Sequence, residues 1–165
     1  MLISAISIAI SVTALTFSIF AWQLSRLKDK RDLYLQLHER LIASDLRRGR
    51  SDLADRACTP EGAESLVGDR KSDDYERVCR ALSMLDLAAL YVEQRYINRK
   101  MFEREWGDIY ASLRENAVEF IAARKQGDPQ YSIWEWEHFM TLANRIHDQS
   151  RIGAVSAQGN SLPST

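Results

Sequence analysis

Hydrophobic side chains repeat at intervals of three and four residues through the centre of the chain, which predicts amphipathic helices. The clearest repeat begins after Asp73, where Glu76 completes a sequence similar to a capping box. Its apolar positions are Tyr75, Val78, Leu82, Leu85, Ala89, Val92 and Tyr96. This spacing predicts a core helix over residues 73–96.

Two further helices are predicted after this one. Asn98 marks the start of a helix over residues 99–125, and Gly127 and Pro129 are typical of its end. Its buried stripe is expected to comprise Phe102, Trp106, Ile109, Leu113 and Phe120. Ser132 and Glu135 form a second capping box, which opens a helix over residues 133–148. The apolar stripe of that helix is expected to comprise Trp136, Phe139, Met140, Ala143 and Ile146.

Helical patterns also precede the central repeat. Residues 27–44 are expected to continue an N-terminal helix, and a further helical stretch is expected from Asp45 to about Ala57. The stripe of the first comprises Leu27, Tyr34, Leu37, Leu41 and Ile42. Thr59-Pro60-Glu61-Gly62 and Gly68 then interrupt the pattern, so residues 58–72 are predicted to be a loop with at most one short turn. No pattern typical of a strand occurs in the sequence.

The first 25 residues contain no charged side chain, and the next six contain four cations: Arg26, Lys28, Lys30 and Arg31. As a helix, residues 2–24 span roughly 35 Å, which is enough to cross a hydrocarbon core about 30 Å thick. We therefore predict an uncleaved transmembrane anchor. The alternative is a cleaved signal peptide, but no cation precedes the apolar stretch and bulky residues end it. The flanking cations predict an outside N-terminus and a cytoplasmic C-terminal domain at the bacterial inner membrane.

The predicted fold class is all-α, with one N-terminal transmembrane helix followed by a cytoplasmic antiparallel bundle of about four helices. The domain boundaries that we predict are an anchor over residues 1–25, a juxtamembrane helical segment over 26–57, a loop over 58–72, a helical core over 73–149 and a disordered tail over 150–165. The tail is expected to be disordered because no charge remains after Arg151 and residues 153–165 are small and polar, with Pro163 among them.

Small residues recur along the anchor at heptad spacing. They are Ser4, Ser7, Ser11, Ala14, Ser18 and Ala21, and Ser25 continues the pattern. Such a seam lets two helices approach closely, so we expect a homodimer through the transmembrane helix. The alternative is that serine and alanine, which are common in single anchors, match the heptad by coincidence.

The charges are unevenly distributed. The chain has 165 residues and a net charge of −1. Residues 26–50 hold eight Lys or Arg against four Asp or Glu, whereas the remaining residues are acidic overall. A basic collar formed by Arg26, Lys28, Lys30 and Arg31 suits the anionic surface of a lipid bilayer. No concentrated basic face suggests a nucleic-acid-binding domain.

No residue pattern indicates an enzyme, a cofactor or a metal. The histidines His38, His138 and His147 lack the i, i+4 spacing of a helical zinc pair, and HExxH is absent. Cys58 and Cys79 fit no metal-ligand spacing and are expected to be free thiols in a reducing cytoplasm. If the topology were inverted, these two cysteines could instead form a disulfide.

The sequence predicts specific roles for three polar or aromatic residues. Asp86 lies among apolar neighbours and is expected to form an ion pair with Arg80, Arg95 or Arg114, the alternative being a functional acid. Asn116 is expected to be an inward-facing amide that fixes helix register. Trp134 lies off the apolar stripe of its helix and is the candidate for an exposed interaction aromatic.

The chain resembles a family of uncharacterised small bacterial membrane-anchored helical proteins. The resemblance rests on the anchor and basic collar, the segment Ser44-Asp45-Leu46-Arg47, and the run from Leu85-Asp86-Leu87-Ala88-Ala89-Leu90 through Met101-Phe102 to Trp106-Gly107-Asp108. It implies a bacterial inner-membrane protein and assigns no catalytic residue.

These features together predict a membrane-anchored protein-interaction or assembly module without enzymatic activity. The anchor provides self-association, and an unknown protein partner is expected for the helical bundle. The alternative is an accessory or sensor subunit of a bacterial stress or phage-defence system.

Overall fold

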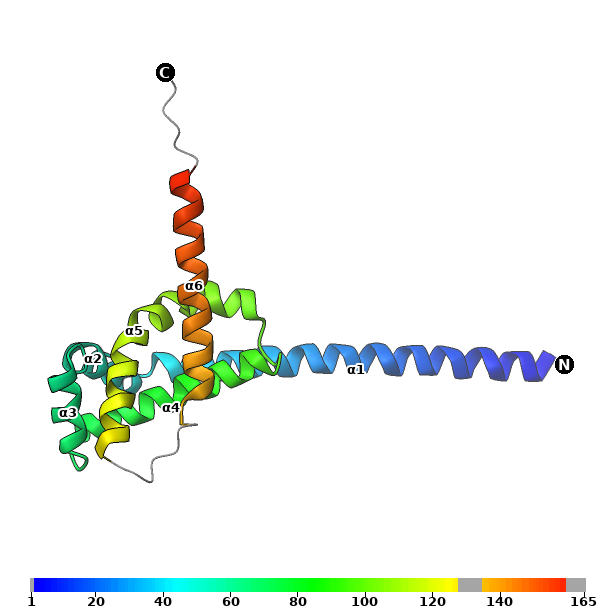
Figure 1. The fold of residues 1–165 in the computed structure, drawn as a ribbon. Coiled ribbons are helices and arrows are strands. Elements are labelled where there is room, and N and C mark those ends of the chain that lie inside the picture. The colour runs from blue at the N-terminus through cyan, green and yellow to red at the C-terminus, as the bar shows by residue number, and fades with distance from the viewer. Residues whose placement is uncertain (1, 128–134, 160–165) are drawn as a thin grey trace, which may run out of the picture. The chain divides into compact units, whose positions relative to one another are not determined.

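The computed structural model describes the backbone of residues 2–127 and 135–159, and the side chains of residues 13–26, 28–127 and 135–151. These residues form six α-helices and no strand (Figure 1). The helices are α1 (Leu2–Ile42), α2 (Ser44–Arg56), α3 (Pro60–Gly68), α4 (Asp73–Glu93), α5 (Arg99–Gly127) and α6 (Glu137–Gly159). The predicted all-α class is therefore confirmed.

The chain divides into two compact units, residues 1–38 and residues 39–165. The first unit consists of most of α1, and the predicted juxtamembrane segment 26–57 is split between the two. Helix α1 is continuous from Leu2 to Ile42, as the sequence predicts, because neither glycine nor proline interrupts it. Among the residues whose side chains are described, no helix is long and apolar enough to cross a membrane.

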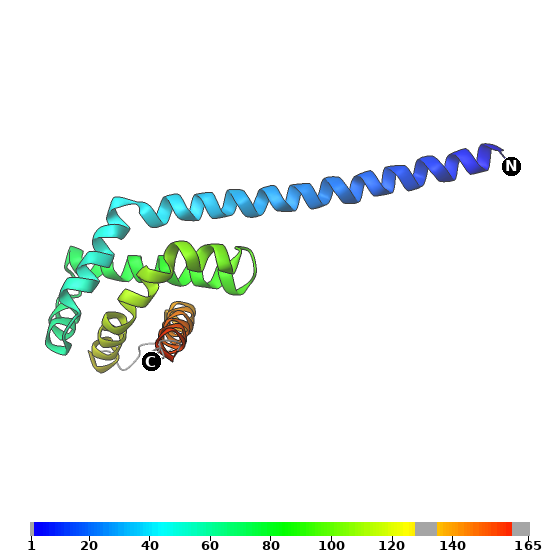
Figure 2. The ribbon, with the colours of Figure 1, turned by 90° about the horizontal axis from the view of Figure 1, so that it is seen from above.

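In the second unit, α4 packs against α2 and α6, and α5 packs against α3 and α6. Figure 2 shows the C-terminal half of α5 between α3 and α6. The largest fully buried side chains come from the end of α1 and from α2, α4, α5 and α6; they are Leu41, Leu53, Val78, Leu82, Leu85, Phe102, Tyr110, Phe120 and Phe139. The core is therefore shared by helices that are distant in sequence.

Helix α3 overturns the predicted loop over residues 58–72. Thr59 caps this helix by accepting a hydrogen bond from the backbone N–H of Gly62 at 3.1 Å, and Pro60 occupies its first turn. Threonine followed by proline is favourable at a helix N-terminus, because the missing N–H of proline needs no partner there. The Thr59-Pro60 pair thus starts a helix rather than ending the helical pattern.

The caps of the next two helices are set by single side chains. Ser72, not Asp73, caps α4: its hydroxyl accepts a hydrogen bond from the N–H of Tyr75 at 3.2 Å. Asp73 and Glu76 lie in the first turn, where negative charge is favourable. Asn98 accepts a hydrogen bond from the N–H of Met101 at 3.1 Å, so the predicted start of α5 is confirmed.

Helix α4 ends three residues earlier than predicted. Tyr96 and Arg95 donate their backbone N–H groups to the carbonyl oxygens of Tyr91 and Val92, at 3.0 and 3.2 Å. This is a Schellman motif, and Arg95 has the left-handed φ of 60° that the motif requires. Tyr96 consequently leaves the predicted stripe and is exposed.

We expect Arg95→Gly to stabilise the second unit by about 1 kcal/mol, because glycine adopts the left-handed conformation without the steric cost of a side chain. Thermal unfolding of the full chain in mild detergent, followed by circular dichroism, measures the effect. The matched control is Gln94→Gly at the neighbouring residue, whose φ of −74° gives glycine no advantage. A melting temperature lowered equally by both changes would contradict the expectation.

Helix α6 begins later and ends later than predicted. It starts at Glu137, after Trp136 with its φ of 63°, and continues to Gly159 through most of the predicted tail 150–165. The predicted capping serine, Ser132, lies outside the described residues. The predicted end at Asp148 is wrong because no glycine or proline breaks the helix there.

The predicted stripes also need correction at further positions. Ile42 in α1 is exposed, and four stripe residues are only half-buried: Tyr34, Tyr75, Ile109 and Met140; Tyr110 and Leu142 are buried instead. Apolar spacing identifies the buried face to within about one residue, because a helix turns by 100° per residue. Contacts with the neighbouring helices then select which side chains lie at its centre.

Candidate interaction surfaces

Residues 15–24 of α1 expose large apolar side chains. They are Leu15, Phe17, Ile19, Phe20, Trp22 and Leu24, with exposed fractions between 46 and 72%. At 100° per residue these positions lie on two opposite faces of the helix rather than on one stripe. Exposed apolar surface of this extent is typical of a segment that is covered by a membrane or by another protein.

The basic collar directly follows this apolar segment. Arg26, Lys28, Lys30 and Arg31 are exposed. The guanidinium carbon of Arg26 lies 4.0 Å from the centre of the Trp22 ring, which is a cation–π geometry. Tryptophan and arginine at this boundary combine an apolar body with a polar end, the arrangement that suits a membrane interface.

The predicted serine seam is only partly described. Ala14, Ser18 and Ala21 are exposed side chains of α1, whereas the side chains of Ser4, Ser7 and Ser11 lie outside the described residues. The hydroxyl of Ser18 donates a hydrogen bond to the carbonyl oxygen of Ala14 at 2.9 Å. Its proton is therefore used within the helix, and close packing of small side chains is the contribution that Ser18 offers a second helix.

Trp134, the predicted exposed aromatic, also lies outside the described residues. The structure instead shows an open groove between α5 and α6. It is lined by Val118, Ile121, Ala122, Lys125, Glu135, Glu137, Met140, Thr141 and Asn144. The sequence does not reveal this groove, because its two walls come from different helices and most of its residues lie off the predicted stripes.

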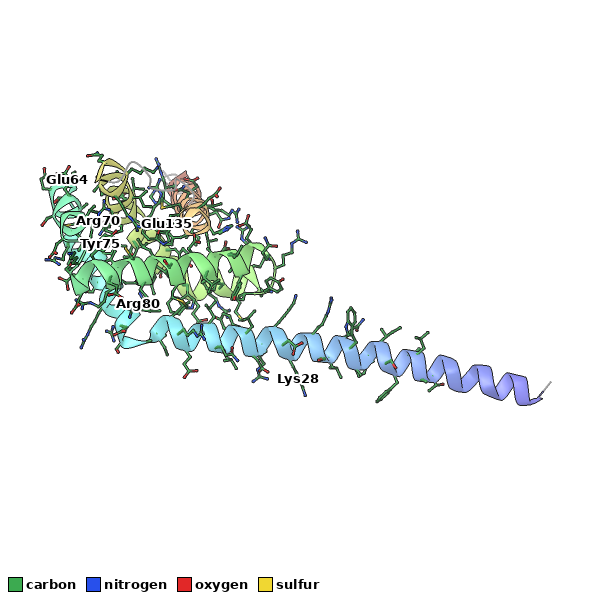
Figure 3. The ribbon with its side chains drawn as sticks, turned by 90° about the horizontal axis from the view of Figure 1, so that it is seen from below. Lys28, Glu64, Arg70, Tyr75, Arg80 and Glu135 are labelled. Atoms are coloured by element: carbon green, nitrogen blue, oxygen red, sulfur yellow. The ribbon has the colours of Figure 1, made fainter. Side chains whose placement is uncertain are left out.

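Arg124 of α5 is the centre of a mixed cluster that joins α4, α5 and the start of α6. Its guanidinium carbon lies 5.7 Å from the Tyr75 ring and 5.0 Å from the Trp136 ring. One of its nitrogens donates to the Cys79 sulfur at 3.4 Å, and another lies 3.2 Å from a carboxylate oxygen of Glu135. Tyr75 and Glu135, labelled in Figure 3, belong to this cluster. The two rings and the carboxylate stabilise the positive charge of Arg124.

The two cysteines are both free thiols, as predicted, and differ in environment. Cys58 is exposed, and its sulfur lies 3.3 Å from the carbonyl oxygen of Asp55. Burial raises the pKa of the Cys79 thiol, an effect that the nearby Arg124 opposes. A thiol with a raised pKa is mostly protonated at neutral pH and is a poor nucleophile.

We expect a maleimide reagent to label Cys58 in seconds to minutes at neutral pH and Cys79 at least tenfold more slowly, because Cys79 is partly buried and its pKa is raised. Mass spectrometry of Cys58→Ser and Cys79→Ser variants distinguishes the two rates. The rate at Cys79 should increase at higher pH as the thiolate forms. In denaturant the two cysteines should be labelled at equal rates. Equal labelling rates in the folded protein would contradict the different environments of Cys58 and Cys79.

Asp86 does not form the predicted ion pair. Its carboxylate instead accepts a hydrogen bond from the backbone N–H of Phe139, in the first turn of α6, at 2.8 Å. Arg80 pairs with Glu76 and Asp45 on the surface instead. The negative charge at this helix N-terminus satisfies an N–H group that has no partner within α6. Asp86 is therefore a structural cap between helices.

Asn116 joins two helices, in agreement with its predicted inward position. Its side-chain nitrogen donates to the carbonyl oxygen of Ala54 at 2.9 Å and lies 3.5 Å from that of Leu53. Both carbonyls belong to the last turns of α2. The bond satisfies a carbonyl near a helix C-terminus and fixes where α5 lies along α2.

His138 and His38 each have a neighbour of their own. His138 lies 2.7 Å from a carboxylate oxygen of Glu93, and the His38 ring lies 6.2 Å from the Tyr34 ring. Across the part of the chain with described side chains, no three His, Cys, Asp or Glu residues are close enough together to hold a metal ion.

Comparisons with known proteins give one match. No curated protein and no solved structure matches the chain. The model of a family described as a domain of unknown function, DUF4760, matches residues 3–146, which include α1 to α5 and the first part of α6. The chain therefore belongs to the DUF4760 family, a domain of unknown function.

Proposed function

We propose that this chain is a single-pass membrane protein that assembles with a second copy through α1 and holds its helical second unit at the cytoplasmic face of a bacterial inner membrane. Residues 1–25 act as the anchor, with the N-terminus outside. The observation that carries the proposal is an uncharged segment of 25 residues that continues, within one unbroken helix, into a segment with four cations.

Two properties of α1 support membrane insertion. Its large apolar side chains between Leu15 and Leu24 are exposed on α1, which is typical of a surface that meets a membrane or another protein. The cations Lys28 and Arg31 follow only on the C-terminal side, as positive-inside orientation requires for a cytoplasmic second unit.

The second unit supports an interaction role rather than catalysis. Three of its polar side chains make contacts between helices. Asp86 caps α6, Asn116 bonds to the end of α2, and Arg124 lies between the rings of Tyr75 and Trp136. The thiol of Cys79 has a raised pKa, which opposes nucleophilic chemistry.

Membrane attachment is tested by expressing the full chain in bacteria and washing membranes with alkaline carbonate. We expect the wild-type chain to stay in the membrane pellet. Leu15→Lys combined with Ile19→Lys should release it, because each lysine costs about 3 kcal/mol near the centre of a membrane helix. Gln36→Lys, on the same helix beyond the collar, should have no effect. Release of the wild-type chain by carbonate would overturn the proposed anchor.

Orientation is tested separately with reporters fused after Thr165. A fluorescent protein that matures only in the cytoplasm should be bright, and alkaline phosphatase, which needs an oxidising compartment, should be inactive. The opposite pair of results would mean that the second unit lies outside the cytoplasm.

A further inference from the structure

The heptad spacing of the seam does not end with the small residues. After Ala21 the same alternation of four and three residues selects Ser25, Lys28, Asp32 and Leu35. All four side chains are exposed on α1, and Leu35 is 52% exposed although it is a large apolar residue. A charged pair followed by an exposed leucine therefore continues the face that the small residues begin.

The surface of α1 is hollowed on this face. A shallow depression is lined by Ala21, Leu24, Ser25, Lys28 and Arg31 (Figure 3 labels Lys28). The first four of these residues have the relative positions 0, 3, 4 and 7. In a parallel coiled coil, four residues with this spacing form the hole that receives one side chain of the facing helix.

We propose that α1 pairs with α1 of a second copy of this chain as a parallel, in-register coiled coil from the seam to Leu35. This deepens the proposed assembly function, on which it rests, by naming the face, direction and register of the pairing. Two chains inserted into one membrane with the same orientation present their helices in parallel, so the anchor favours this direction.

The charges on this face complement one another in that register. Lys28 of one copy enters a hole formed by Ser25, Lys28, Asp29 and Asp32 of the other, so its ammonium group meets two carboxylates and one ammonium group. Asp32 enters a hole formed by Lys28, Arg31, Asp32 and Leu35, so its carboxylate meets two cations and one carboxylate. After a shift of one heptad, Asp32 of one copy lies against Leu35 and Glu39 without a cation, and Lys28 of the other copy enters a hole without a carboxylate. Fewer charges are matched in the shifted pairing, so the charged layers favour the in-register one.

Disulfide trapping tests the register in the full chain, in membranes, with Cys58→Ser and Cys79→Ser as background. We expect Leu35→Cys to form a dimeric disulfide under mild oxidation, because equivalent core positions face each other in a parallel coiled coil. Lys30→Cys, on the opposite side of the same helix, is the matched control. Equal trapping at the two positions would overturn the proposed pairing.

Charge exchange tests the complementary layers. Lys28→Asp alone and Asp32→Lys alone should each reduce trapping at Leu35→Cys by about tenfold, because each places like charges together. The variant that restores complementarity exchanges all four charges, Lys28→Asp, Asp29→Lys, Arg31→Asp and Asp32→Lys; it keeps the net charge, gives each hole an excess of opposite charge again and should restore trapping. If this fourfold variant remained as poor as the single variants, the pairing in this register would be wrong.

The carbonate wash distinguishes this inference from the anchor. All of these variants should remain in the membrane pellet, because they leave residues 1–25 unchanged. If Leu35→Cys without a charge change remains in the pellet but is not trapped above the Lys30→Cys control, the coiled coil alone is contradicted, whereas release of the wild-type chain contradicts the anchor.

Discussion

Gly49→Ala is expected to destabilise the second unit by about 3 kcal/mol, at the upper end of the usual cost of overpacking. Gly49 lies in α2 where this helix crosses α4. A Cβ atom at this position would overlap the backbone carbonyl oxygen of Arg77 and would lie 2.9 Å from the Cβ of Ala81. Because a backbone oxygen in the middle of α4 cannot rotate away, the two helices must separate.

Gly107→Ala is the matched control for this substitution. Gly107 is also buried in a helix, but an added Cβ would meet only Cγ2 of Ile146 at 3.7 Å, an ordinary van der Waals distance. We expect it to be neutral or to stabilise the second unit by up to about 1 kcal/mol, because alanine is the better helix former. Thermal unfolding of both variants in mild detergent measures the difference. Similar melting temperatures for Gly49→Ala and Gly107→Ala would contradict the proposed close approach of α2 and α4.

Tyr110→Ala is expected to cost about 4 kcal/mol, because it removes a fully buried ring from the centre of the second unit. The Tyr110 ring lies 5.6 Å from that of Phe102 and 5.2 Å from that of Phe139, measured between ring centres. Its hydroxyl donates to the carbonyl oxygen of Leu85 at 2.6 Å. One side chain thus joins α4, α5 and α6.

Tyr110→Phe removes the hydroxyl but keeps the ring. It should lower the free energy of unfolding by only about 1 kcal/mol, the usual net value of a hydrogen bond. Burial raises the pKa of Tyr110 well above its ordinary value of 10.0. The unfolded chain ionises above that value while the folded chain keeps its proton, so this tyrosine contributes stability below pH 10 that decreases as the pH rises further. Tyr110→Phe should lose that alkaline decrease; an unchanged alkaline profile would contradict the assigned burial.

The sequence by itself determined the fold class and most of the helices. Three- and four-residue spacing predicted α2, α4 and α5 to within a few residues, because an amphipathic helix repeats its buried face along the chain. Asn98 also predicted the start of α5, since a side-chain cap acts over only three residues. The unbroken α1 follows in the same way from the absence of glycine and proline over residues 2–42.

Tertiary contacts decided what local signals cannot encode. The partner of Asp86 is a backbone N–H 53 positions later in the chain, so the sequence suggested arginines on nearby turns instead. Arg124 meets Tyr75, Cys79 and Trp136 only after three segments pack together. The left-handed Arg95 shows no local signal either, because glycine rather than arginine is the usual residue at that position of a Schellman motif. Propensity and spacing act over one or two helical turns, whereas the packing of α4, α5 and α6 selects among side chains that are equally apolar or equally charged in the sequence.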